Sequence, residues 1–107
     1  MKQIFILTIL SFFTVILLHA QTDTVKILTS AQCDMCKETI ENDLSFTKGV
    51  KKSNLDVDSK ILTVIYNSEK TNPEKIREAV TKSGYDADSL QGDPKAYKRL
   101  PDCCKKQ

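Results

Sequence analysis

The chain contains no tryptophan and only one histidine, His19. His19 lies in an N-terminal stretch that we expect to be removed, which would leave the rest of the chain without an imidazole. Such a chain lacks the usual general base, the base of a catalytic triad and the histidine ligands of a zinc–hydroxide site. The sequence therefore argues against these kinds of catalysis, and we expect a protein that is not an enzyme.

The N-terminal apolar run is too short for a membrane-spanning helix. It extends from Ile4 to Leu18, whereas a spanning helix needs roughly 18–20 apolar residues. Lys2 precedes the run and the small residue Ala20 follows it, which is the layout of a secretory signal peptide. We expect residues 1–20 to be removed by cleavage near Ala20–Gln21 and the protein to be exported to the periplasm or the cell exterior. An uncleaved anchor is the alternative.

A strong charge of either sign is also absent. The formal net charge is +2 over 107 residues, and removal of Lys2 with the signal peptide would lower it by one. This near-neutrality gives no electrostatic basis for binding nucleic acid or an anionic membrane surface. A chain of this length supports one small domain with a modest core.

Cysteine, in contrast, is present four times, as Cys33, Cys36, Cys103 and Cys104. Four cysteines in an exported protein suggest disulfides, for which three pairings exist. Without the signal peptide, Met35 is the only methionine, so the soft-metal ligands are limited to four thiols and one thioether. Disulfide formation and metal binding both remain open, because a Cys33–Cys36 bond could be reduced before a metal binds.

Hydrophobic periodicity predicts the order strand, helix, strand, strand, helix, short strand. The strands are expected at residues 25–29, 50–57, 61–66 and 85–90. The helices are expected to begin at Asp34 and Asn72 as N-caps, and Gly84 to end the second helix. This order predicts an α+β ferredoxin-like βαββαβ sandwich, in which two helices cover one face of a four-stranded antiparallel sheet. The sandwich would span residues 21–90, and residues 91–107 would form a basic Cys-Cys tail with at most one helical turn.

Cys33 and Cys36 stand at the junction between the first expected strand and the first helix. Two thiols three residues apart at such a junction can point the same way and hold one ion. Thiolate sulfur suits Cu(I), Hg(II) and Zn(II), and a helix N-terminus lowers a thiol pKa because its partial positive charge favours the thiolate. Two ligands satisfy Cu(I) or linear Hg(II) and leave the ion open to an incoming thiol, whereas a closed structural zinc site takes four. The spacing therefore predicts a carrier of a soft metal ion.

Taken together, these features resemble the heavy-metal-associated domain family over residues 24–88. The residues that carry the resemblance are the Cys-x-x-Cys loop, Ile40, Leu44, Gly49–Val50, Leu55–Val57, Leu62–Val64, Ala79–Val80 and Gly84–Tyr85. Within the family, the chain is most similar to periplasmic mercury-binding proteins and small bacterial copper chaperones. The resemblance implies that Cys33 and Cys36 bind Cu(I) or Hg(II), with Zn(II) as a further candidate. It also implies hand-over by thiolate exchange to a membrane metal transporter or another metal-accepting protein, with no small-molecule substrate and a monomer or metal-bridged dimer.

Three further residues are expected close to the metal. The resemblance places Tyr85 beside the loop, where its hydroxyl would shield or hydrogen-bond a cysteine sulfur, and the alternative is a core tyrosine. Asp34 is expected to cap the helix, with an oxygen ligand for Zn(II) as the alternative. Met35 is expected to make an apolar contact, with a thioether ligand as the alternative.

The tail pair Cys103-Cys104 is the least expected feature of the chain. Adjacent cysteines do not easily bind one ion together, and three interpretations remain open. The pair could form an auxiliary soft-metal site on a flexible arm, which we favour. It could fold back to add sulfur ligands to Cys33 and Cys36 and so produce a Cys₃ or Cys₄ site. It could also be redox-active or bridged to another molecule, with no metal role.

Two other functions compete with that of a metal carrier. The first is a thiol–disulfide oxidoreductase that uses Cys33 and Cys36, although no tryptophan adjoins the motif and no proline is placed to face a redox disulfide. The second is a binding module whose cysteines serve only as disulfide staples.

Overall fold

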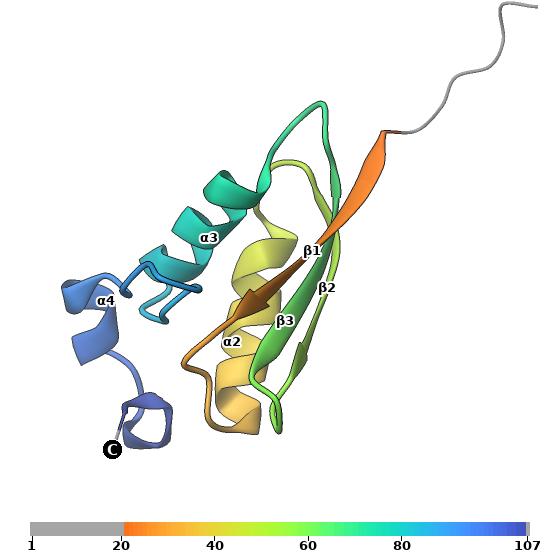
Figure 1. Cartoon of the computed structure of the whole chain (residues 1–107). Coiled ribbons are helices and arrows are strands. Elements are labelled where there is room, and N and C mark those ends of the chain that lie inside the picture. The colour runs from red at the N-terminus through yellow and green to blue at the C-terminus, as the bar shows by residue number, and fades with distance from the viewer. Residues whose placement is uncertain (1–20, 107) are drawn as a thin grey trace, which may run out of the picture.

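The computed structural model of the chain describes residues 21–106 (Figure 1). The predicted signal peptide, residues 1–20, lies outside the described residues. The elements in chain order are β1 (Thr22–Leu28), α2 (Asp34–Ser45), β2 (Val50–Asp56), β3 (Ile61–Asn67), α3 (Pro73–Lys82), α4 (Pro94–Lys98) and the 3₁₀ turn η2 (Asp102–Cys104). No helix within residues 21–106 combines the length and the apolar character that a membrane span requires.

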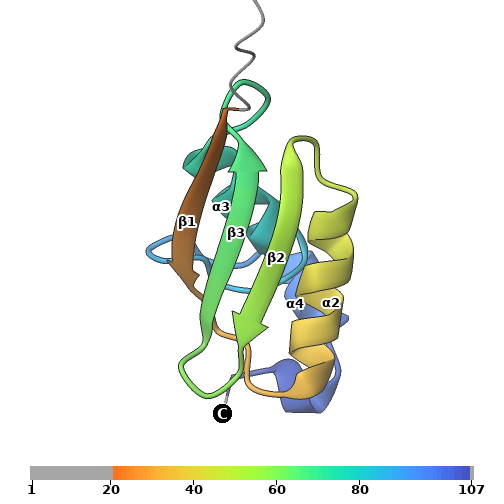
Figure 2. The same cartoon turned by 90° about the vertical axis from the view of Figure 1, so that its right-hand side faces the viewer.

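Three antiparallel strands form the sheet in the order β1-β3-β2. The alternation in the central strand β3 buries Leu62, Val64 and Tyr66 and directs the intervening side chains to the other face. Helices α2 and α3 both cover the face with the buried side chains, while the opposite face of the sheet is open (Figure 2). The predicted α+β sandwich with two helices on one face of an antiparallel sheet is therefore confirmed.

The expected fourth strand is reduced to isolated bridges in the described part of the chain. Ala87 pairs singly with Thr29 and with Leu90. At Asp88 the backbone adopts a positive φ of 51°, which turns the chain away from the sheet. The Asp88 carboxylate also accepts a hydrogen bond from the Leu28 N–H at 2.9 Å. A side chain thus satisfies the edge of β1 at the position where another strand would have continued.

The ends of α3 follow the sequence prediction. The Asn72 side chain accepts a hydrogen bond from the Lys75 N–H at 2.9 Å, and Pro73 is the first helical residue. Gly84, with a φ of 100°, follows the helix in the left-handed conformation that a helix-terminating glycine adopts. This ending directs residues 85–92 back across the molecule toward the loop that carries Cys33.

The C-terminal tail packs on the domain, although the sequence predicts little structure there. Gly92 approaches the backbone of Gly84 so closely that an added Cβ would lie 2.5 Å from the Gly84 carbonyl oxygen. The Asp93 N–H donates to the Thr81 carbonyl at 2.8 Å, and the Asp93 side chain then caps α4. Leu100 packs against the core beyond α4. These contacts bring η2 next to the start of α2 (Figure 1).

Candidate metal site

Cys33 is the N-cap of α2. Its backbone is extended, with φ −150° and ψ 171°, and helical geometry begins at the next residue. The sequence predicts Asp34 as the N-cap, and this prediction is wrong: Asp34 is the first helical residue, and its exposed carboxylate lies in the first turn. Placing the cap one residue earlier puts the Cys33 sulfur directly at the helix N-terminus, where backbone N–H groups stabilise negative charge.

Cys36 lies one turn further along α2 and faces the core. Its side chain is fully buried, together with Ile40 and Leu44 on the same face of the helix. The Cys33 and Cys36 sulfur atoms are 3.2 Å apart. The structure therefore brings the two predicted metal ligands together, one partly exposed and one buried.

The tail cysteines lie against the same loop. The Cys103 Sγ is 3.0 Å from the Cys33 Sγ, and the Cys104 Sγ is 3.5 Å from it. Cys104 is buried and forms a disulfide with Cys36, whereas Cys33 and Cys103 are free thiols. The Met35 sulfur is 3.8 Å from the Cys103 Sγ. Of the three interpretations of the tail, the geometry matches the folded-back arrangement and not the favoured flexible arm. Of the disulfides that four cysteines allow, the one present joins Cys36 to Cys104.

The electrostatic surroundings favour ionisation of Cys33. Hydrogen bonding to the Cys103 thiol is the largest influence and lowers the pKa of Cys33. Burial and the Asp34 carboxylate oppose this, but the backbone N–H groups of Met35 and Cys36 lower the pKa further, and the net shift is downward. The same contact raises the pKa of Cys103. Cys33 is thus the thiol of the pair that more readily becomes a thiolate, which is the form that binds soft metals.

Tyr85 lies in the core next to this cluster. Its side chain is 0% exposed, and its hydroxyl has no hydrogen-bond partner among residues 21–106. Burial is the main reason that the pKa of Tyr85 is raised, interaction with the nearby Thr39 side chain opposes the increase, and Cys33 and Cys103 add to it. The ring is therefore a core component, and its unpaired hydroxyl is within electrostatic reach of the sulfur atoms.

Replacement of Tyr85 by Phe tests the state of this hydroxyl. An unsatisfied buried hydroxyl costs free energy, so Tyr85→Phe is expected to raise the free energy of unfolding of the metal-free protein by about 1 kcal/mol. The matched control is Tyr97→Phe, because the Tyr97 hydroxyl accepts a hydrogen bond from the Lys106 N–H at 2.9 Å. That variant should lose about 0.5–1.5 kcal/mol. Urea unfolding compares them, and a loss of stability in Tyr85→Phe would show that its hydroxyl is satisfied.

Sequence reasoning missed the residues that anchor the tail beside the cysteines. Asp86 forms an ion pair with Lys106, and its other carboxylate oxygen accepts the Gly92 N–H at 2.9 Å. Burial alone would raise the pKa of Asp86, but Lys106 and the Gly92 amide outweigh it and lower the pKa. No sequence pattern pairs an aspartate with a lysine 20 positions away across an unassigned tail, so only the folded chain shows this contact.

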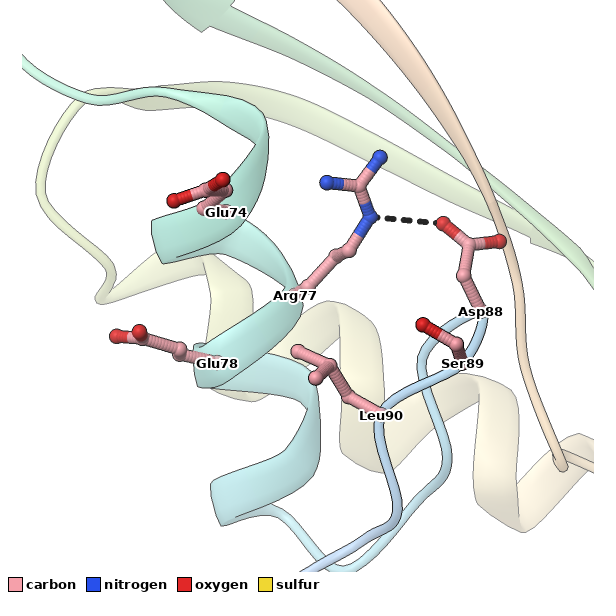
Figure 3. A pocket seen from close by; sticks show the side chains of 6 residues that line it. All are labelled: Glu74, Arg77, Glu78, Asp88, Ser89 and Leu90. Carbon is pink, nitrogen blue, oxygen red and sulfur yellow. Dashed lines mark hydrogen bonds and ion pairs between the residues drawn. The ribbon is translucent and has the colours of Figure 1, made fainter.

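A hollow between α3 and residues 88–90 contains none of the cysteines. Glu74, Arg77, Glu78, Asp88, Ser89 and Leu90 line it (Figure 3). The Arg77 Nε donates to Asp88 at 2.8 Å across this space. Its lining includes no cysteine and no histidine, so the hollow offers no soft-metal ligand.

The Asp88 carboxylate should make stability depend on pH. Burial tends to raise the pKa of Asp88, but Arg77 and the Leu28 N–H hold it below its ordinary value. A carboxyl group whose pKa is lowered by folding stabilises the fold above its unfolded pKa of about 3.9, and this contribution is lost as the pH falls below that value. We expect Asp88→Asn to remove this part of the stability loss between about pH 5 and pH 2, and Arg77→Gln, which leaves the hydrogen bond from the Leu28 N–H, to remove a smaller part of it. Thermal unfolding over this range checks it, and an unchanged pH profile in both variants would contradict it.

Comparison with known proteins gives a consistent result for the loop and the core. A family model described as the heavy-metal-associated domain matches residues 30–86. The copper chaperone CopZ of Staphylococcus haemolyticus (strain JCSC1435) is 32% identical over 54 residues, which are 50% of this chain and 79% of that protein. The match to the family model ends before the tail, so Cys103 and Cys104 lie outside it.

Solved structures of similar fold include a CopZ metallochaperone, oxidized MerP and the mercury-bound form of MerP. Oxidized MerP from Ralstonia metallidurans CH34 has a TM-score of 0.59 and 25% identity, with 62% of this chain and 93% of that chain covered. A CopZ metallochaperone has a TM-score of 0.59 and 21% identity, with 61% and 98% covered. The second likeness shows the fold alone.

Proposed function

The chain belongs to the heavy-metal-associated domain family, and from this premise we propose that it carries Cu(I) on Cys33 and Cys36 and passes the ion to an acceptor protein by thiolate exchange. The observation that carries the proposal is the geometry of the loop. Two sulfur atoms 3.2 Å apart lie in the first turn of α2, and the pKa of Cys33 is lowered. Once the Cys36–Cys104 disulfide is reduced, such a pair can hold one ion, and the partly exposed Cys33 sulfur is the position at which a thiol of another protein can enter.

Copper is the proposed cargo because the curated relatives at 32% identity are copper chaperones. Cu(I) and Hg(II) are both soft ions that two thiolates satisfy, so the chemistry of the loop accepts either ion. The likeness to the mercury-bound form of MerP, at 25% identity, keeps Hg(II) as the second candidate.

We further propose that the protein acts outside the cytoplasm. The apolar run after Lys2 supports export, and a disulfide between Cys36 and Cys104 is typical of an oxidising compartment. The acceptor would then be a membrane metal transporter or another protein that presents thiols on an exposed loop.

An anaerobic titration of the reduced protein with Cu(I) and Hg(II), in competition with chelators of known affinity, tests the function. One tight equivalent of Cu(I) is expected, and Cys33→Ser/Cys36→Ser should lose it. Cys103→Ser/Cys104→Ser is the matched control, because it makes the same chemical change in the tail and should keep tight Cu(I) binding. Retention of tight Cu(I) binding by Cys33→Ser/Cys36→Ser would overturn the proposal.

Insulin reduction with the same preparation tests the competing oxidoreductase function. We expect no turnover above that of the free reductant. Vigorous turnover that depends on Cys33 and Cys36 would favour a thiol–disulfide oxidoreductase instead of a carrier.

A further inference from the structure

The four cysteine sulfurs form one compact cluster at the start of α2. Cys33 is at its centre, 3.2 Å from Cys36, 3.0 Å from Cys103 and 3.5 Å from Cys104. The sulfurs of Cys103 and Cys104 are 3.9 Å apart. Cys33, Cys103 and Cys104 alone place three potential ligand atoms within 4.8 Å of one another. Two of these three residues, Cys103 and Cys104, belong to the tail. A loop with two cysteines can bind a soft ion without them, so their position here calls for a separate explanation.

These separations can be compared with those that different coordination numbers require. Two thiolates on opposite sides of one ion, with bonds of about 2.3 Å, lie about 4.6 Å apart, whereas sulfurs at the corners of a tetrahedron lie about 3.8 Å apart. The separations around Cys33 are between 3.0 and 3.5 Å, and the tail pair is separated by 3.9 Å. After reduction separates the Cys36 and Cys104 sulfurs, these other pairs need only small outward shifts to reach tetrahedral spacing, and larger shifts for linear coordination.

Besides the Cys36–Cys104 disulfide, several contacts that involve no cysteine hold the tail at the loop. Asp86 pairs with Lys106 on one side of η2, and the Tyr97 hydroxyl accepts the Lys106 N–H. Upstream, Gly92 donates to Asp86 and packs against Gly84. Because these contacts fix both ends of residues 92–106, the tail sulfurs are positioned before any metal arrives, and less conformational entropy is lost on binding.

A second observation points to a bound ligand at this position. The Tyr85 hydroxyl is completely buried and makes no hydrogen bond of ordinary geometry among the described residues, although the Thr39 side chain lies near it together with the charges of Cys33 and Cys103. A buried hydroxyl is normally paired. A metal-bound thiolate, which keeps its negative charge, would provide the missing acceptor.

We propose that, after reduction of the Cys36–Cys104 disulfide, the tail cysteines join Cys33 and Cys36 as ligands of a single soft ion, so that the tail closes the open loop into a site of three or four thiolates suited to Zn(II) as well as Cu(I). The inference rests on the proposed function, since it takes Cys33 and Cys36 as ligands. A thiol reductant breaks the Cys36–Cys104 bond, leaves two thiols and is itself oxidised to a disulfide. Each thiol that then binds the ion releases its proton to solvent.

The two ions should respond differently to loss of the tail ligands. Zn(II) prefers four ligands, whereas two thiolates already satisfy Cu(I). In the reduced protein, Cys103→Ser/Cys104→Ser is expected to weaken Zn(II) binding by at least about 100-fold. Removal of a residue that only supports a metal ligand typically costs roughly 10- to 100-fold. Its Cu(I) affinity should fall by less than about tenfold, while a competing chelator should remove Cu(I) faster than from the wild-type protein.

Chelator competition with Zn(II) and with Cu(I) measures the affinities, with circular dichroism to verify that the variant folds. X-ray absorption on the Zn(II)-loaded wild-type protein counts sulfur neighbours without any substitution, and three or four are expected. Two sulfur neighbours, or Zn(II) affinity unchanged in Cys103→Ser/Cys104→Ser, would overturn the inference and leave the proposed function intact. The proposed function fails separately, if Cys33→Ser/Cys36→Ser keeps tight Cu(I) binding.

Discussion

Protein purified without reductant will bind Cu(I) at least about 100-fold more weakly than the reduced protein. This exceeds the roughly 10- to 100-fold loss that follows removal of a residue that only supports a metal ligand. The disulfide between Cys36 and Cys104 removes one of the two loop ligands. The remaining thiols, Cys33 and Cys103, are 3.0 Å apart, and Cys103 ionises less readily because its pKa is raised. Addition of a thiol reductant before the titration should restore tight binding, because it regenerates the Cys33–Cys36 pair.

Thiol counting and peptide mapping check the state that causes this difference. The untreated protein should show two free thiols and a peptide in which Cys36 is linked to Cys104. Cys103→Ser is the matched control: it should show one free thiol fewer, keep the same linkage and need reduction to the same degree. Four free thiols in the untreated protein, or a Cys33–Cys36 linkage, would contradict the expectation.

The disulfide would hold the tail on the loop in the oxidised protein, and a bound metal ion would hold it there in the reduced protein. The Cys36–Cys104 bond joins residues 68 positions apart, and a closed loop of that length stabilises a fold by about 4 kcal/mol in the chain-entropy description. Reduction removes this contribution, and an ion held by the loop and the tail would restore a link between them. Such a protein would keep its tail docked when oxidised or metal-loaded, and would hold it least firmly when reduced and metal-free.

The sandwich could be predicted from the sequence because its signals are local. The alternation in β3 and the Asn72–Pro73 helix start each depend on a few adjacent residues, and both have the predicted structure. The N-cap of α2 was assigned one residue too late, because Asp34 has the stronger capping preference while the backbone becomes helical directly after Cys33. The sequence pattern predicts a fourth strand at residues 85–90, but the chain makes only isolated bridges at Ala87 and turns at Asp88.

Of the candidate site, the sequence predicts the Cys33–Cys36 pair but not the position of the tail cysteines. The spacing of Cys33 and Cys36 carries its own chemical meaning, whereas the position of Cys103 and Cys104 depends on contacts between distant segments. The Asp86–Lys106 ion pair and the approach of Gly92 to Gly84 are two such contacts. Neither leaves a periodic pattern in the sequence, so the folded-back tail remained one of three open interpretations.

Gly92→Ala is expected to displace the tail and lower the free energy of unfolding by about 1–3 kcal/mol, the range for inserting an atom into a packed site. Its new Cβ would lie 2.5 Å from the Gly84 carbonyl oxygen and 2.9 Å from the Tyr85 nitrogen. Both neighbours are backbone atoms, which cannot rotate aside as a side chain would. Residues 92–106 must therefore shift, while all four cysteines remain in the chain.

Gly49→Ala supplies the control that separates tail displacement from general destabilisation. Gly49 has a φ of 84°, and its added Cβ would lie 2.8 Å from the Thr71 Cγ2, so this variant should also lose about 1–3 kcal/mol. Both variants should therefore unfold at lower urea concentration. Only Gly92→Ala should expose residues 92–106 to limited proteolysis and weaken Zn(II) binding by the reduced protein, because Gly92, unlike Gly49, packs where the tail docks on the domain. Equal Zn(II) affinities in the two variants would show that the docking of the tail does not contribute to the metal site.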